Sequence, residues 1–185
     1  MHWNQWIKNK LMSKLRVAVN SKDHIQGNAN APIELLEYGD YQCPHCGHAY
    51  PIIKSIQKKM GAKLKFVFRN FPLAEVHPNA LHAAVSSEAA ALQNKFWEMH
   101  DHLFEFQSRL DDESLVKYAR QLHLNVEQFE TDFEKPELIQ KVDGDFESGA
   151  RSGVNGTPGF FINGEKYNDS WDEETLLTYL ESLLK

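Results

Sequence analysis

The sequence is poor in cysteine. Its 185 residues contain only two, Cys43 and Cys46, within the stretch "DYQCPHCGHAYP". A disulfide between cysteines this close would close a tiny loop and would restrict the unfolded chain very little. A structural disulfide framework is therefore excluded, and the pair must be catalytic, metal-binding or incidental.

The sequence also lacks long apolar runs and clusters of positive charge. No apolar run approaches the roughly 18 residues of a membrane-spanning helix. The net charge is −6 and no arginine-rich stretch appears, so we expect no nucleic-acid partner and no membrane contact. Hydrophobic residues make up 42% of the chain. That share predicts a real core, in one domain or in one domain with an insertion.

A secretory signal is also missing from residues 1–22. Basic residues are spread through this segment, and no apolar stretch of about 7–15 residues follows them. We therefore expect a cytoplasmic protein as the chain reads, and a periplasmic or extracytoplasmic one if an export signal is missing from this chain. Trp3, Trp6 and Leu11 recur at helical spacing. They predict a short helix packing on the body, or alternatively an anchor at a membrane surface.

What the sequence does contain begins with a strand, a helix and a second strand. Residues 33–38 are a short apolar run that ends at Gly39. Residues 43–60 have apolar side chains at helical spacing, and Gly61 is a typical helix end. In residues 63–71, apolar side chains alternate as they do in a buried strand. This order is typical of a βαβ unit, whose two strands lie parallel.

The rest of the chain is first helical and then returns to strands. Residues 72–144 have apolar side chains at helical spacing, which predicts a helical insertion. Residues 160–167 read as two short strands around Asn163-Gly164, a strong signal for a two-residue hairpin. Residues 172–184 read as an amphipathic helix. The predicted order is β-α-β, a helical block, then β-β-α.

The two cysteines lie where the first helix is predicted to begin. Cys43 would be the N-cap and Pro44 the first helical residue, where its missing N–H costs nothing. The Cys43 sulfur would then face the free amides of His45 and Cys46 and the positive end of the helix dipole. Such positions lower a thiol pKa to roughly 3.5–7.5. A protonated His45 would stabilise the thiolate further, and Cys46, one turn on, suits the resolving thiol.

A metal site is the main alternative reading of the pair. Zinc would use Cys43, Cys46 and His48, but no second cysteine pair supplies the remaining ligands of a common structural site. Incidental cysteines inert in a core fit poorly, because the flanking residues are polar. We therefore expect no metal and no cofactor.

These motifs together resemble the DsbA family of thiol–disulfide oxidoreductases. The similarity lies in "DHIQGNANAPIELLEYGDYQCPHC", in "FRNFPL" followed by "HPNA", and in "GTPGFFING" far downstream. It implies an α/β protein with a thioredoxin fold and an inserted α-helical domain. The implied division is an N-terminal extension at 1–22, a thioredoxin-like domain at 23–71 and 145–185, and a helical insertion at 72–144.

The resemblance also implies roles for residues outside the cysteine motif. It implies that Pro158 follows a cis peptide bond and lies against the active cysteines. The backbone of Thr157 would then be presented to an extended substrate beside Cys43. Glu37, six residues before Cys43, matches a buried acidic position that takes up or relays a proton near Cys46. The alternative for Glu37 is an ordinary solvent-facing strand residue.

The leading functional hypothesis is an enzyme that exchanges disulfides with protein or peptide thiols through a mixed disulfide at Cys43. Pro44 and His45 favour oxidase-like chemistry, and a separate redox partner would reset the cysteines. A cytoplasmic reductase or isomerase, supplied with electrons by another protein, is a close alternative. Two further hypotheses are a thioredoxin-fold protein that binds a metal or cluster, and a peptide-binding module with inert cysteines.

Overall fold

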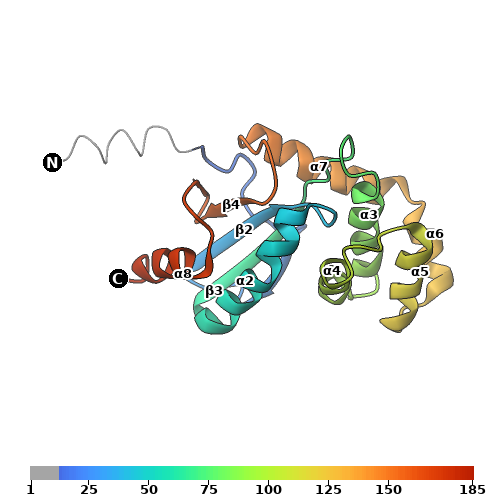
Figure 1. The fold of residues 1–185 in the computed structure, drawn as a ribbon, viewed down its shortest axis with the longest axis horizontal. Coiled ribbons are helices and arrows are strands. Elements are labelled where there is room, and N and C mark those ends of the chain that lie inside the picture. Colours follow the sequence, from blue (N-terminus) through green and yellow to red (C-terminus); the bar gives the residue numbers. More distant parts are fainter. Residues whose placement is uncertain (1–12) are drawn as a thin grey trace.

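The computed structural model describes residues 13–185, which form a twisted sheet flanked by helices (Figure 1). Within this part, the sheet has five strands in the order β1-β3-β2-β4-β5. The strands are β1 (His24–Gly27), β2 (Ile33–Gly39), β3 (Leu64–Asn70), β4 (Gly159–Ile162) and β5 (Glu165–Tyr167). The helices are α2 (Pro44–Met60), α3 (Ala80–Ala91), α4 (Phe96–Glu105), α5 (Asp112–Gln121), α6 (Val126–Phe133), α7 (Pro136–Arg151) and α8 (Glu173–Ser182).

The predicted βαβ unit is confirmed. β2 and β3 pair in parallel, with Leu35 opposite Phe66, and α2 connects them. The predicted hairpin is also present: β4 and β5 pair antiparallel. The turn between these strands consists of Asn163, with φ 50°, and Gly164, with φ 79°; a tight hairpin turn requires such positive values. The α/β fold class predicted from the sequence is therefore correct.

Both faces of the sheet are buried, which explains why the central strands read as nearly continuous apolar runs. Side chains alternate along a strand, so Leu35 and Phe66 face one side while Leu36 and Val67 face the other. The first side packs on α2, α8 and the helical block. The second packs on α7 and the segment that precedes β1.

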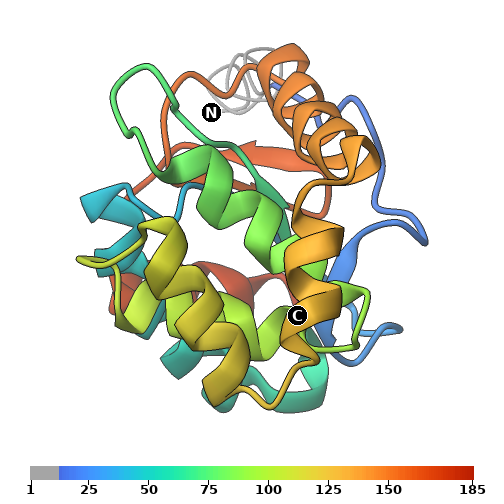
Figure 2. The same ribbon diagram turned by 90° about the vertical axis from the view of Figure 1, so that its right-hand side faces the viewer.

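Five helices, α3 to α7, lie between β3 and β4 in the chain: α3 to α6 gather on one side of the molecule, and α7 runs from this group along the second face of the sheet (Figure 1, Figure 2). α3 packs on α4, α5, α6 and α7. The expected limit of the insertion, between residues 144 and 145, falls inside α7, which continues to Arg151. The division of the chain into a thioredoxin-like domain and an insertion stays a prediction.

The sequence did not reveal β1. This strand, "HIQG", pairs antiparallel with β3 at the edge of the sheet. It is four residues long and contains one large apolar side chain, Ile25, so no alternation of burial is visible in its sequence. Tertiary pairing with β3 makes it a strand.

Residues 13–23 are bound to the body of the protein. Lys14 forms an isolated antiparallel β-bridge with Glu165 of β5. The backbone N–H of Leu15 donates to the Gly164 carbonyl, 2.8 Å away. The helix or surface anchor predicted from Trp3, Trp6 and Leu11 lies outside the described residues. In the part of the chain that the structure describes, no helix is long and apolar enough to cross a membrane.

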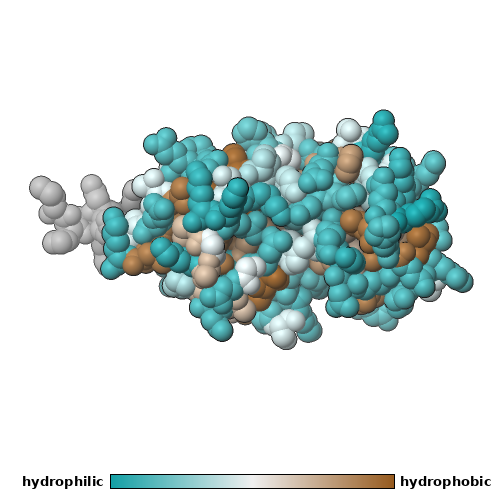
Figure 3. All heavy atoms as spheres, turned by 90° about the horizontal axis from the view of Figure 1, so that it is seen from below, coloured by the Kyte–Doolittle hydropathy of each residue, from teal (hydrophilic) through white to brown (hydrophobic). Residues whose placement is uncertain are grey.

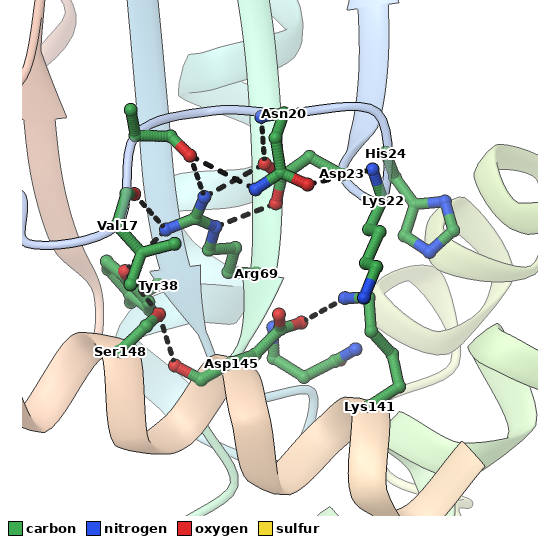
Figure 4. Close-up of polar contacts among 12 residues, drawn as sticks. Val17, Asn20, Lys22, Asp23, His24, Tyr38, Arg69, Lys141, Asp145 and Ser148 are labelled. Carbon is green, nitrogen blue, oxygen red and sulfur yellow. Dashed lines mark hydrogen bonds and ion pairs between the residues drawn. The ribbon is translucent and has the colours of Figure 1, made fainter. Parts of the chain in front are cut away.

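A buried arginine holds this segment against the second face of the sheet (Figure 4). The Arg69 guanidinium donates to both carboxylate oxygens of Asp23, at 2.7 and 2.8 Å. It also donates to the carbonyl of Val17 and to the Tyr38 hydroxyl, each at 2.9 Å. That hydroxyl is 2.8 Å from the Ser148 hydroxyl on α7. A buried charge is tolerated when its hydrogen bonds are satisfied in this way, so the network joins the segment, the sheet and α7.

The face seen in Figure 3 is mostly hydrophilic, and its hydrophobic residues lie in separate small groups. Scattered apolar residues of this kind are normal on a monomer surface. Two exposed apolar side chains lie close in sequence to residues of the site below: Val76 is 69% and Phe106 is 45% exposed.

Candidate active site

The site is built at the end of β2, where the chain enters α2. Cys43 is the N-cap of α2 with φ −71° and ψ 122°, and Pro44 is its first residue, as the sequence predicts. Both thiols are free in the structure. Cys43 is only 4% exposed, so little of it is open to an attacking group.

The surroundings of Cys43 favour the thiolate. The largest contribution is a hydrogen bond from the Cys46 thiol, which acts against the opposing effect of burial. With smaller contributions from Thr157 and from the backbone N–H groups of Cys46 and His45, the net effect lowers the pKa of Cys43 to about 5. The two amides are the free donors at the start of a helix. The predicted lowering of the Cys43 pKa therefore agrees with the geometry.

Cys46 lies beneath Cys43 and has the opposite environment. It is fully buried, and burial raises its pKa well above the ordinary value, as does its hydrogen bond to Cys43. The backbone N–H of Asp40 donates to the Cys46 sulfur at 3.5 Å. At neutral pH this cysteine is therefore a thiol, and it must lose a proton before it can attack.

Glu37 is a buried acidic side chain whose charge acts on Cys46. Side chains alternate along β2, so Glu37 shares the α2 side of the sheet with Leu35. It is 3% exposed, which rules out a solvent-facing strand residue. Burial, and secondly the charge of Cys43, raise its pKa to about 8. Its Oε1 atom has no hydrogen-bond partner among the described residues.

The loop before β4 completes the site. The Thr157–Pro158 peptide bond is cis. The Cys43 thiol donates to the carbonyl oxygen of Thr157 at 3.4 Å. The Thr157 hydroxyl is buried without a hydrogen-bond partner among the described residues, so it is free to donate to a thiolate at Cys43. The structure thus brings Thr157 beside the cysteine, as the family resemblance implies.

The side chain of His45 lies at the surface, outside this buried arrangement. It is exposed, as is that of Pro44, and the groups that lower the Cys43 pKa include the backbone of His45. His48 is also exposed and has its ring 5.7 Å from that of Trp171. Among residues 13–185, no group of three or more His, Cys, Asp or Glu side chains could hold a metal ion.

Sequence reasoning missed the groups that hold the loop between β2 and α2. The buried Asp40 carboxylate accepts from the backbone N–H of Leu73 at 2.9 Å and from His77 Nδ1 at 2.7 Å. Gln107, just after α4, donates to the carbonyls of Tyr41 and Cys43. These partners are far apart in sequence. His77 lies in the quoted "HPNA" similarity, which was the one available signal; nothing pointed to Gln107.

Comparison with known proteins gives a family. The family model described as Thioredoxin matches residues 19–182. The chain is 38% identical over 170 residues to the Na(+)/H(+) antiporter NhaA 1 of Mycolicibacterium vanbaalenii, covering 91% of this chain and 28% of that protein. The antiporter of the same name from Salinispora arenicola is 37% identical over 155 residues, covering 84% of this chain and 24% of that protein. The chain therefore spans about a quarter of the length of these curated relatives.

Solved structures show the same fold. A thioredoxin-like oxidoreductase from Silicibacter pomeroyi has a TM-score of 0.79 and 22% identity, covering 88% of this chain and 92% of that one. The thiol-disulfide exchange protein alpha-DsbA2 from Wolbachia pipientis has a TM-score of 0.79 and 21% identity, covering 89% and 88%. BdbD from Bacillus subtilis has a TM-score of 0.76 and 24% identity, covering 88% and 92%. This chain therefore belongs to the thioredoxin family and has the fold of its DsbA-type members.

Proposed function

We propose that this chain is a protein disulfide oxidoreductase of the DsbA type, which exchanges disulfides with protein or peptide substrates through Cys43 and Cys46. One observation carries the proposal. A sulfur with a pKa lowered to about 5 lies at a helix start, directly above a second, buried thiol. The thiolate is the reactive form of cysteine, and exchange proceeds through a mixed disulfide.

The exchange steps balance within this site. In the oxidising direction, a substrate thiolate attacks the Cys43 sulfur of the Cys43–Cys46 disulfide and releases the Cys46 sulfur as a thiolate. That thiolate takes up a proton, and we assign its supply to Glu37, whose carboxyl has a pKa of about 8. A second substrate thiolate then attacks the substrate sulfur and releases Cys43 as a thiolate. The substrate leaves oxidised and the protein remains as a dithiol.

The direction we favour is oxidation of the substrate. A group that stabilises the Cys43 thiolate stabilises the reduced protein, because the thiolate exists only there, and the disulfide becomes the stronger oxidant. The competing candidate is a reductase or isomerase, which fits a cytoplasmic location, where the pair would rest as a dithiol. An extracytoplasmic location would fit the oxidase. In either direction a redox partner must reset the cysteines.

The surface around Cys43 supports a polypeptide substrate. The exposed side chains Val76 and Phe106 directly precede His77 and Gln107, whose side chains bind the loop around Cys43. Exposed apolar side chains beside the residues that hold this loop would suit an unfolded chain, which presents apolar side chains and extended backbone. The Thr157 backbone beside Cys43 would align that extended segment.

The antiporter name of the curated relatives describes much longer proteins. The match covers 170 residues in one of them and 155 in another. We assign no ion transport to this chain.

The test is catalysed refolding of a reduced, unfolded substrate protein, with a parallel assay of insulin reduction. Faster disulfide formation with the oxidised protein supports an oxidase. Faster insulin reduction with no effect on disulfide formation would favour the reductase, and inactivity in both assays would overturn the proposal.

Replacing His45 by alanine is expected to weaken the oxidant. A positive charge on the exposed imidazole, two residues after Cys43, would favour the thiolate, so removal of the ring should raise the Cys43 pKa and lower the reduction potential. A change of about 30 mV corresponds to about 1.4 kcal/mol for two electrons. Equilibration with glutathione mixtures measures it, and His48→Ala is the matched control on the same exposed helix surface. Equal potentials for the wild type and His45→Ala would remove the imidazole from the redox centre.

A further inference from the structure

Just after α4, Gln107 binds the backbone of the loop between β2 and α2, residues 40–43, which we call the redox loop. Gln107 follows the last residue of α4 by two positions, and its Nε2 donates to the carbonyl oxygens of Tyr41 and Cys43, each 2.8 Å away. An amide nitrogen carries two hydrogens, and both are used here. The amide oxygen could not take this place, because it would meet two acceptors. The chemistry of the partners therefore fixes which end of the amide faces the loop.

The first turn of α2 leaves room for this side chain. A Cβ atom at Gly47 would lie only 2.3 Å from Gln107 Oε1, closer than real Cβ contacts allow. The Gly47 backbone N–H also donates to the Cys43 carbonyl, at 3.1 Å. This carbonyl thus receives two bonds, the first helical bond of α2 and the bond from Gln107. The absence of a side chain at Gly47 therefore leaves space for the Gln107 amide beside the Cys43 carbonyl.

We propose that Gln107 is a positioning residue for Cys43, which holds the backbone of the redox loop from the helical block. The proposal rests on the proposed function, because it concerns the same sulfur. The two bonds fix the carbonyls on either side of Gln42 and so hold Cys43 in its N-cap conformation. In that conformation the Cys43 sulfur meets the amides of His45 and Cys46. Without Gln107, the Tyr41 carbonyl would lose this donor and the Cys43 carbonyl would keep only its helical bond from Gly47. The contacts of Asp40 with Leu73 and His77 would remain.

The test replaces Gln107 by methionine, which has a similar length and no donor. The readout is the thiolate absorbance of the reduced protein against pH, which needs no substrate. Gln107→Met is expected to raise the Cys43 pKa by about one unit. The matched control is Gln93→Met. Gln93 also makes two backbone hydrogen bonds, both to Asn125, but at a distance from the cysteines within the helical block. This control is expected to lose stability in a urea melt without changing the Cys43 pKa.

Gly47→Ala provides a second variant, which keeps the glutamine but displaces its amide. It should shift the Cys43 pKa in the same direction, and the double variant should shift it little further than either single change. An unchanged pKa in Gln107→Met, or in Gly47→Ala if the first variant does not fold, would show that Gln107 only stabilises the fold. Failure of the proposed function looks different: the wild-type protein itself would then show no turnover, whatever the difference between variants.

Discussion

Replacing Cys43 by serine is expected to lower the rate of disulfide exchange by on the order of a thousandfold or more. A serine hydroxyl is not ionised at neutral pH, whereas the Cys43 thiol, with a pKa of about 5, is almost fully ionised there. Replacing Cys46 by serine has a different expected result. The first exchange step can still occur at Cys43, but no buried thiol is left to release the substrate, so mixed disulfides should accumulate.

Gels run without reductant, followed by mass spectrometry, separate these outcomes. Cys46→Ser should form adducts with a substrate peptide disulfide and Cys43→Ser should form none. Brief alkylation of the reduced wild type at pH 6 is the control, and it should label Cys43 first, because the pKa of Cys46 lies well above its ordinary value. Adducts on Cys43→Ser, together with faster labelling of Cys46, would reverse the two roles.

Replacing Glu37 by glutamine is expected to make the protein more stable at alkaline pH. The carboxyl has a pKa of about 8 when folded, against an ordinary value of 4.5. Below pH 4.5 it is protonated in both states and costs nothing. As pH rises from 4.5 to 8, the unfolded state ionises first, so the folded state loses stability relative to it. The cost is complete above about pH 8 and is on the order of 5 kcal/mol.

Urea melts of the reduced wild type and Glu37→Gln at pH 5 and pH 8.5 measure this effect. The advantage of the variant should grow between these pH values. It should grow less in the oxidised proteins, because the Cys43 thiolate, which also raises the Glu37 pKa, is then absent. Resolution of the mixed disulfide should slow in the variant, because its side chain cannot exchange a proton with Cys46. A stability difference that does not change with pH would show that Glu37 ionises normally.

The elements of the fold could be predicted where the sequence pattern is local. Alternating apolar residues gave β3, and Gly61 and Asn163-Gly164 marked the ends of a helix and the turn of a hairpin. The position of Cys43 at a helix start followed from Pro44. These features depend on neighbours within a few residues, so they are visible without the fold.

The remaining features depend on residues that are distant in sequence. β1 exists because it pairs with β3, and Arg69 is tolerated because Asp23 and the preceding carbonyls surround it. The contacts of His77 with Asp40 and of Gln107 with Cys43 join segments that only the folded chain brings together. Glu37 was singled out by family resemblance; its burial beneath the cysteines required the fold.

The reduction potential of the Cys43–Cys46 pair tests the central claim most directly. The reduced and oxidised wild-type proteins are equilibrated with glutathione mixtures at pH 7, and alkylation of the free thiols followed by mass spectrometry gives the fraction of each form. A stabilised thiolate at Cys43 should place the potential between about −180 and −120 mV, well above the roughly −270 mV of thioredoxin. A value near −270 mV or below would contradict the oxidase, and failure to form the disulfide between these two cysteines would contradict disulfide exchange itself.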